Sequence, residues 1–158
     1  MDDKLENKLV KQFPNLFSDY NKDMKLTAMC WGCECNDGWY DLLYKTCEKL
    51  EPLVTKWLKE NPKDFDFKPR FSQVKEKYGT LRIYWTSATD KMYAITDTAE
   101  RKSAKVCETC GNSGKVRGQG WLYCACIKHT KPEDRDNLEY LENEYDKKHK
   151  KIKEKKNG

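Results

Sequence analysis

Long apolar runs are missing from this chain, and histidine is scarce. No stretch approaches the ~20 apolar residues that a membrane span requires, and the start of the chain lacks the basic and apolar segments of a secretory signal. The histidines are His129 and His149 alone, and the sequence has neither a Gly-x4-Gly-Lys-Ser/Thr phosphate loop nor a His-Glu-x2-His pair. We therefore expect a soluble, unexported protein without membrane partners. We also expect that it is not an enzyme, because groups for acid–base chemistry are few.

The length and composition favour one folded domain with an appendage. A chain of 158 residues and 18.7 kDa is close to the ~100–150 residues of a typical folding unit. Apolar residues make up 37% and charged residues 36%, so the core is modest, but an aromatic content of 12% argues against disorder. We predict a single domain over residues 1–130 and a charged helical tail over residues 131–158. Apolar residues recur in this tail at near-heptad spacing, at Leu138, Leu141, Tyr145 and Ile152.

The net charge of +5 comes from the end of the chain. Residues 147–158 hold seven lysines against the single Glu154, so the rest of the chain is almost neutral. Nonspecific affinity for nucleic acid depends on clustered Lys and Arg side chains that neutralise phosphates. The whole-chain charge therefore overstates the case for such binding.

Helical spacing of apolar residues predicts several helices. It runs over residues 4–13 and stops at Pro14, which indicates a short amphipathic helix. Asp37 suits the N-cap of a second helix, and Pro52 suits the first turn of a third. Residues 88–106 return to helical spacing.

One segment has the alternation of a β-strand. Apolar and more polar side chains alternate there in the order Leu81, Arg82, Ile83, Tyr84, Trp85. One face of this strand is therefore expected in the core, while the other faces outward. Val74 and Tyr78 fit either a strand or a helical turn, and we predict a hairpin about Tyr78-Gly79. The predicted fold class is α+β, with helices packed on a small antiparallel sheet or hairpin.

Two pairs of residues have the spacing of zinc ligands. Cys107-x2-Cys110-Gly111 predicts a tight knuckle whose two sulfurs point at one centre, and Cys126-x2-His129 supplies the other half of a tetrahedron. Four protein ligands close the coordination sphere, so the expected Zn²⁺ ion is structural and does not activate water. This zinc knuckle, over residues 107–129, forms the C-terminal end of the predicted domain.

The remaining cysteines leave alternatives open. Cys124 either replaces Cys126 as a ligand or is a buried thiol, and Trp121 and Tyr123 are expected to pack beneath the ribbon between the ligand pairs. A second group of cysteines begins with a Cys-x2-Cys-x-Cys pattern, but it has no histidine nearby and its last member lies in an apolar helical stripe. Buried thiols are therefore favoured over a second metal for Cys30, Cys33, Cys35 and Cys47.

Basic and aromatic residues interleave between residues 75 and 85, in a combination that grips a phosphate and stacks on a base. The candidate ligand-binding residues are Lys75, Lys77, Tyr78, Arg82 and Tyr84, together with Trp31, Trp39 and Tyr40. The alternative is a solvated strand face whose charges keep the edge of the sheet soluble. In that interpretation the last three residues are plain core aromatics.

Four segments carry distinctive motifs: residues 13–17, residues 29–40 from Met-Cys-Trp-Gly to Asp-Gly-Trp-Tyr, residues 74–84, and the knuckles of residues 107–129. Together they resemble a family of small, mostly uncharacterised proteins encoded by bacteriophages. The resemblance covers about residues 13–129, and it implies a phage accessory protein that acts in the cytoplasm of the infected bacterium. Family members usually carry a bulky apolar residue at the position of Cys33, which implies that Cys33 is not a ligand.

Three functions are compatible with these patterns. The preferred hypothesis is that the protein binds a small anionic nucleotide-like ligand without turning it over, and so sequesters a host antiviral signal. The first alternative is a zinc ribbon that binds DNA or RNA, with an affinity that falls steeply with salt. The second alternative is an inhibitor of a host defence protein, whose heptad-like C-terminal helix pairs with the partner or with another copy of the chain.

Overall fold

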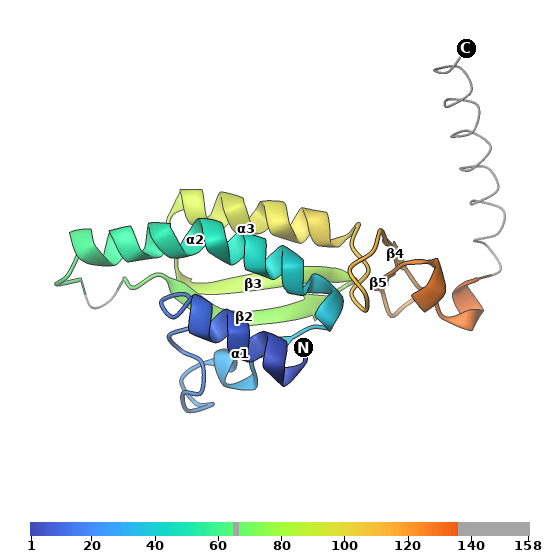
Figure 1. Cartoon of the computed structure of the whole chain (residues 1–158), viewed down its shortest axis with the longest axis horizontal. Coiled ribbons are helices and arrows are strands. Elements are labelled where there is room, and N and C mark those ends of the chain that lie inside the picture. The colour runs from blue at the N-terminus through green and yellow to red at the C-terminus, as the bar shows by residue number, and fades with distance from the viewer. Residues whose placement is uncertain (65–66, 136–158) are drawn as a thin grey trace, which may run out of the picture.

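The computed structural model describes residues 1–64 and 67–135. These residues form an α+β fold, as predicted (Figure 1). Its helices are α1 (Asp3–Gln12), α2 (Tyr40–Glu60) and α3 (Asp90–Ser103), and its strands are β1 (Cys33–Glu34), β2 (Arg70–Lys77), β3 (Thr80–Ser87), β4 (Lys115–Arg117) and β5 (Tyr123–Ala125). The predicted C-terminal helix lies outside the described residues, apart from a 3₁₀ turn over Pro132–Asp134.

The larger sheet has the strand order β1-β2-β3. β2 and β3 are antiparallel, whereas β1 runs parallel to β2. The sheet is therefore mixed, whereas the sequence predicted an antiparallel one. The hairpin turn falls at Tyr78 and Gly79, as predicted. Both residues have positive φ, 56° and 73°, which is the conformation that a type I′ turn requires.

Helices cover one face of this sheet. Leu81, Ile83 and Trp85 of β3 are buried, and they belong to the same core cluster as Leu43 and Leu50 of α2. The intervening residues of β3 face outward and are more exposed, so the alternation read from the sequence is confirmed. Burial of this apolar face is the main force that holds the helices to the sheet.

α2 is one continuous helix of 21 residues that contains Pro52, so the prediction of a new helix at Pro52 is wrong. Proline removes one backbone hydrogen bond and costs about 3 kcal/mol in a helix interior. Leu50 and Val54, on either side of Pro52, are fully buried. Their packing offsets the local cost, because tertiary burial supplies most of the stability of a protein helix.

The predicted capping role of Asp37 is also wrong. A 3₁₀ turn over Asp37–Trp39 precedes α2, and no side chain caps the N-terminus of α2. Asp37 Oδ1 instead accepts a hydrogen bond from the backbone N–H of Asp2, at 2.7 Å. Asp37 thereby ties the start of α1 to the segment that leads into α2.

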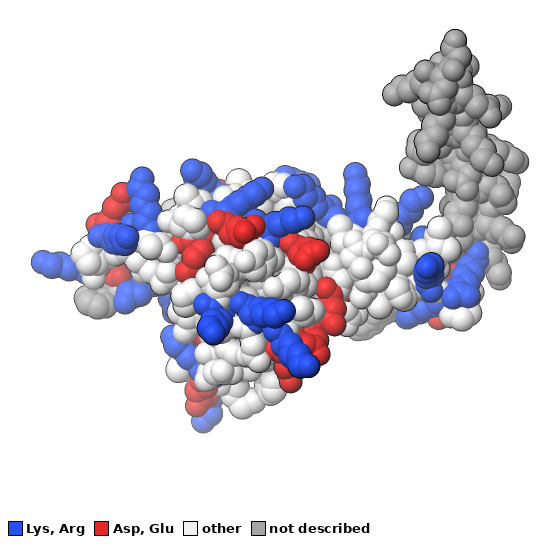
Figure 2. All heavy atoms as spheres, in the orientation of Figure 1, with Lys and Arg blue, Asp and Glu red and all other residues white. Residues whose placement is uncertain are grey.

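Charges of both signs are mixed over the surface. On the face shown in Figure 2, Lys and Arg side chains lie among Asp and Glu side chains over the helices, and they do not form one continuous basic patch. Within residues 1–64 and 67–135, no helix is both long enough and apolar enough to span a bilayer.

Candidate metal centre and the adjoining cleft

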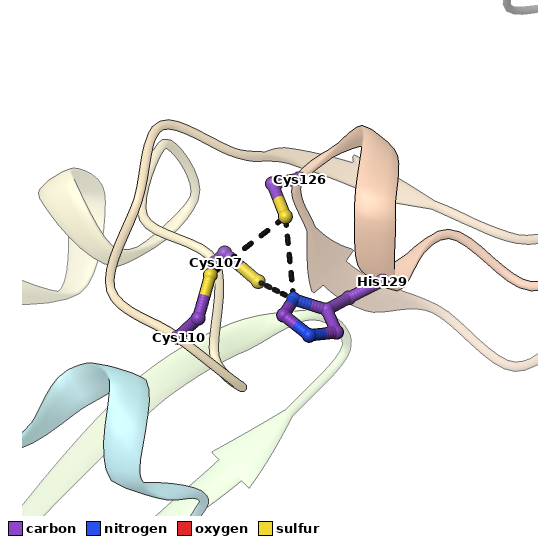
Figure 3. Close-up of side chains that lie close together, drawn as sticks. All are labelled: Cys107, Cys110, Cys126 and His129. Carbon is purple, nitrogen blue, oxygen red and sulfur yellow. Dashed lines mark hydrogen bonds between the residues drawn. The ribbon is translucent and has the colours of Figure 1, made fainter.

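The candidate metal ligands come from both sides of the β4–β5 hairpin. Cys107 and Cys110 lie in the segment after α3, whereas Cys126 and His129 follow β5. The four side chains converge in Figure 3, and their three sulfur atoms and one imidazole nitrogen all lie within 4.8 Å of one another. The fold therefore brings together the ligand set that the sequence predicts.

The distances match a tetrahedral zinc site. Zinc bonds of about 2.3 Å to sulfur and about 2.0 Å to nitrogen place two sulfurs about 3.8 Å apart, and a sulfur and a nitrogen about 3.5 Å apart. Cys110 Sγ lies 3.7 Å from Cys126 Sγ. His129 Nδ1 lies 3.5 Å from Cys107 Sγ and 3.3 Å from Cys126 Sγ. The cluster can thus hold a metal ion such as zinc.

The backbone of the knuckle favours the thiolate form of Cys107. Burial acts to raise the pKa of this thiol, but backbone N–H groups of Cys126, Cys110 and Thr109 lower the pKa to about 6. Thiolates are the metal-binding form of cysteine. Gly111, with φ of 75°, closes the turn by donating its N–H to the Cys107 carbonyl at 2.8 Å, and this is a conformation that glycine adopts without strain.

Cys124 is not part of the cluster. Its side chain is buried, and burial raises the pKa of its thiol to about 11. Its carbonyl accepts the backbone N–H of Glu108 at 3.0 Å. Of the two alternatives for Cys124, the structure supports a buried thiol, with Cys126 as the ligand.

The N-terminal cysteines form no second cluster in the described part of the chain, where the Cys₃His group is the only set of candidate metal ligands. Cys33, Cys35 and Cys47 are buried in the core and Cys30 is half-buried. Burial raises the pKa of Cys35 to about 12, so this thiol stays protonated at neutral pH. These positions agree with the preference for buried thiols.

The first knuckle is docked on the segment that leads into α2. Gly38 N–H donates to the Glu108 carbonyl at 2.7 Å, and Trp39 Nε1 donates to the Val106 carbonyl at 2.8 Å. A Cβ atom at Gly38 would overlap the carbonyl oxygen of Cys107. The metal centre is therefore attached to the main core by close backbone contacts.

Three of the predicted ligand-binding residues lie together. Lys75, Lys77 and Tyr78 line a cleft of about 220 Å³, whose other wall is the loop between β4 and β5, with Trp121. Tyr78 and Trp121 are 66% and 76% exposed. The cleft is thus lined by two exposed aromatic residues and two lysines.

The two walls of the cleft meet at Gly79. A Cβ atom at Gly79 would lie 2.8 Å from Val116 Cγ1 and 3.2 Å from the backbone of Tyr123, so the β2–β3 turn packs directly on the β4–β5 hairpin. The prediction that Trp121 packs beneath the ribbon is wrong. Its loop turns outward through Gly118 and Gly120, with φ of 98° and 101°. Tyr123 does pack against the buried cysteines of the ribbon.

The other predicted ligand-binding residues lie outside this cleft. Arg82 Nη1 lies 3.6 Å from Glu100 Oε2 of α3, and Tyr84 is paired with Gln73 on the outer face of the sheet. Trp31 is exposed in the 3₁₀ helix Ala28–Trp31. Whether these residues contact a ligand stays a prediction.

Two of the predicted aromatic contacts belong to the packing of α2. Trp39 is fully buried, so it offers no surface to a ligand and the prediction of a contact there is wrong. The reason is the indole hydrogen bond to Val106, which fixes Trp39 in the core. Tyr40 is half-buried, with its ring centroid 5.9 Å from that of Tyr44.

A second hollow of about 330 Å³ continues the cleft toward the metal centre. It shares Glu76 and Trp121 with the cleft, and it is also lined by Glu108, Tyr123 and Lys131. Burial raises the pKa of the Glu108 carboxyl group, while a hydrogen bond from the Asn36 backbone opposes this shift. We refer to the two hollows together as the hairpin cleft.

Sequence reasoning missed several residues that line the hairpin cleft. Glu76, Glu108 and Lys131 carry no local pattern that marks them, because they meet only through the fold. Trp121 had a signal: it directly follows the Gly-Gln-Gly turn of residues 118–120, and an aromatic residue at the tip of such a turn has little to pack against.

The chain was also compared with known proteins. No protein family, no characterised protein and no solved structure matches it.

Proposed function

We propose that the protein binds a small anionic nucleotide-like ligand in the hairpin cleft without turning it over, and that its Cys₃His centre holds a structural zinc ion. The observation that carries this proposal is the meeting of Lys75, Lys77, Tyr78 and Trp121 at one cleft. Aromatic rings stack on bases of any sequence, and ammonium groups pair with phosphate oxygens. The sequence resemblance to phage proteins suggests that the ligand is a nucleotide signal of host antiviral defence, which the protein sequesters.

The zinc ion has a supporting role in this proposal. Three cysteines and one histidine fill a tetrahedral coordination sphere, which leaves no position for a water or a substrate. The ligands flank the β4–β5 hairpin, and that hairpin carries Trp121. Zinc binding would therefore hold one wall of the cleft in place.

Charge distribution favours a small ligand over a long nucleic acid. Extended nucleic-acid sites neutralise many phosphates with a continuous basic surface. On the face shown in Figure 2, the basic side chains over the helices are interspersed with acidic ones, and glutamates as well as lysines line the cleft. A single nucleotide needs only a few cationic groups, and Lys75 and Lys77 line the cleft.

Isothermal titration calorimetry of the full-length, zinc-loaded protein tests the proposal. The ligands are the four ribonucleoside monophosphates and a panel of cyclic dinucleotides, and we expect saturable binding of at least one of them. Trp121→Ala removes a stacking surface worth about 1–3 kcal/mol, so it should raise the Kd by roughly 5- to 150-fold.

Trp31→Ala is the matched control: Trp31 is similarly exposed, at 63%, but it does not line the cleft, so a ligand bound in the cleft would not contact it, in contrast to the sequence prediction for Trp31. It should leave the Kd unchanged. Absence of heat with every ligand, in a folded and zinc-loaded sample, would exclude the proposal. Tighter binding of a single-stranded oligonucleotide, with a steep salt dependence, would favour the nucleic-acid alternative instead.

A further inference from the structure

The four candidate metal ligands differ in their exposure to solvent. Cys110 is exposed, whereas Cys107 is fully buried and Cys126 is only 9% exposed. Cys110 is also the only exposed residue among the eight cysteines of the chain. Oxidants react with thiolates that they can reach, and a cysteine that binds zinc is held as a thiolate. Cys110 is therefore the cysteine that a small oxidant in solution meets first.

Cys126 is placed to react with an oxidised Cys110. Cys126 Sγ lies 3.7 Å from Cys110 Sγ, and Figure 3 shows that the two side chains approach each other from different segments of the chain. A disulfide bond is about 2.0 Å long, so the two sulfurs need to approach by only about 1.7 Å. An accessible thiolate beside a second cysteine is the arrangement of redox-sensing cysteine pairs.

Cys107 is less suited to this role, although it belongs to the same cluster. Backbone N–H groups of Cys126, Cys110 and Thr109 donate to its sulfur, and the side chain is fully buried. These hydrogen bonds stabilise the thiolate and so make it a weaker nucleophile. A movement of Cys107 Sγ toward Cys110 would also break them. The geometry therefore favours Cys126 as the partner of Cys110.

A disulfide between Cys110 and Cys126 would remove half of the coordination sphere. Structural zinc sites have four protein ligands, and the thiolate is the form of cysteine that binds metal. Cys107 and His129 would remain, and two ligands do not fill a tetrahedral site. The cluster can thus hold either the zinc ion or the disulfide, but not both.

We infer that the Cys₃His cluster is a redox switch, in which hydrogen peroxide converts Cys110 and Cys126 to a disulfide and the zinc ion is released. The inference rests on the zinc centre of the proposed function and goes beyond it, and it does not depend on the nucleotide.

The reaction takes place in two steps. The Cys110 thiolate attacks one oxygen of the peroxide, which breaks the O–O bond and gives a sulfenic acid and a hydroxide ion. The Cys126 thiolate then attacks the Cys110 sulfur, the S–S bond forms, and the sulfenic oxygen leaves as a second hydroxide ion. The two sulfurs together lose the two electrons that the peroxide gains, and Zn²⁺ keeps its charge. Thiol reductants reverse the change by thiol–disulfide exchange.

Peroxide treatment of the full-length, zinc-loaded protein tests this switch. A chromogenic chelator measures the released metal, and we expect about one zinc ion per chain, with about one peroxide consumed for each ion released. Dithiothreitol followed by zinc chloride should restore the zinc content.

A tryptic digest of the oxidised, unreduced protein identifies the disulfide. Trypsin cleaves after Lys and Arg, so Cys107 and Cys110 lie together in the peptide of residues 106–115, whereas Cys126 lies in the peptide of residues 118–128. Mass spectrometry should find these two peptides linked, with fragmentation that assigns the bond to Cys110 and Cys126. A bond between Cys107 and Cys110 would leave the two peptides separate.

Cys110→His tests the role of the exposed cysteine, because an imidazole can replace a thiolate as a zinc ligand but cannot form a disulfide. This variant should keep its zinc ion and release it about tenfold more slowly than the wild-type protein in peroxide. Cys124→Ser is the matched control, because Cys124 is buried and lies outside the ligand set. It should release zinc at the wild-type rate and form the same disulfide.

The outcomes separate this inference from the proposed function. Retention of zinc in a large excess of peroxide overturns the switch and leaves the zinc centre intact. Zinc release with a Cys107–Cys110 bond, or with an irreversible sulfinic acid at Cys110, also overturns it. Wild-type protein that contains no zinc overturns the zinc centre and the switch together. Absence of nucleotide binding in protein that passes the zinc tests overturns only the nucleotide part of the proposed function.

Discussion

Single glycines decide how closely the segments around the site approach one another. At Gly38 the obstacle to a side chain is the carbonyl of Cys107, and at Gly79 it is Val116 of the neighbouring hairpin. Gly79 also has positive φ, so the turn that forms one wall of the cleft needs glycine for two reasons. The knuckle of Cys107 and Cys110 and the cleft are thus positioned by residues that contribute no side chain.

A buried carboxylate away from the site makes stability depend on pH. Asp19 is 4% exposed, and its two oxygens accept from Lys22 Nζ at 2.6 Å and Arg70 Nε at 2.8 Å. Burial acts to raise the pKa of Asp19, but the hydrogen bonds and charges of Lys22 and Arg70 bring it below its usual value. The folded state therefore binds this proton less readily than the unfolded state.

Asp19→Asn should lower the free energy of unfolding at pH 7 by about 1–2 kcal/mol, since the charged pairs are partly open to solvent. The stabilisation is present above the pKa of Asp19 in the unfolded state, about 4. It is lost as the pH falls through the lower pKa that Asp19 has in the folded state. Urea denaturation at pH 7 and pH 3 should thus show a difference between the two proteins that shrinks in acid.

Glu60→Gln is the control for this prediction, because the Lys56–Glu60 pair is exposed, at 3.7 Å. It should change stability by less than about 0.5 kcal/mol. An Asp19→Asn deficit that is the same at both pH values would contradict the titration account.

At the scale of elements, α3 closes the open edge of the sheet. Ser103 Oγ accepts the Leu81 N–H at 2.8 Å, and Glu100 Oε1 accepts the Ile83 N–H at 2.9 Å. The unpaired backbone N–H and C=O groups of an exposed strand edge can bond to other chains, which promotes aggregation. Here side chains of a helix take the place of another strand.

Ser103→Ala should cost about 1–3 kcal/mol of unfolding free energy, because it leaves the buried N–H of Leu81 without an acceptor. Thr98→Ala, on the exposed face of the same helix, removes a hydroxyl that bonds to Ala94 and should be nearly neutral. Thermal or urea denaturation of both variants makes the comparison. Equal stability of the two variants would show that the edge contact contributes nothing.

The elements that the sequence predicted are those with local signals. α1, the β2–β3 hairpin and α3 each show their own periodicity or turn, and the metal ligands lie in two short motifs. β1 has two residues and pairs with a strand about 40 positions away, so no local pattern marks it. The cleft could not be predicted either, because no local pattern marks it. Lys77 and Trp121 meet only when two hairpins pack together.

At the scale of the whole molecule, the Cys₃His cluster links the β4–β5 hairpin to the main core. The knuckle contacts the segment before α2 through Gly38 and Glu108, and Trp39 of that segment is buried in the core. The β4–β5 hairpin also packs against Gly79 in the turn between β2 and β3. Loss of the metal should therefore disturb the cleft before it disturbs the helices and the larger sheet.

Cys126→Ser and Cys124→Ser provide a matched test of this coupling, because the two cysteines are both buried and stand two positions apart. Elemental analysis should find about one zinc per chain in Cys124→Ser and a loss of zinc in Cys126→Ser, since only Cys126 belongs to the ligand set. Nucleotide affinity should fall with zinc content, because Trp121 stands on the hairpin that the ion holds.

Far-ultraviolet circular dichroism distinguishes local from global effects. α1, α2 and α3 have their own buried face on the larger sheet, so zinc-free protein should keep most of its helical signal while it loses nucleotide binding. Complete unfolding on chelation would mean that the ion supports the entire fold rather than one wall of the cleft. Unchanged nucleotide affinity in a zinc-free sample would separate the cleft from the metal centre, because the hairpin would then hold its position without the ion.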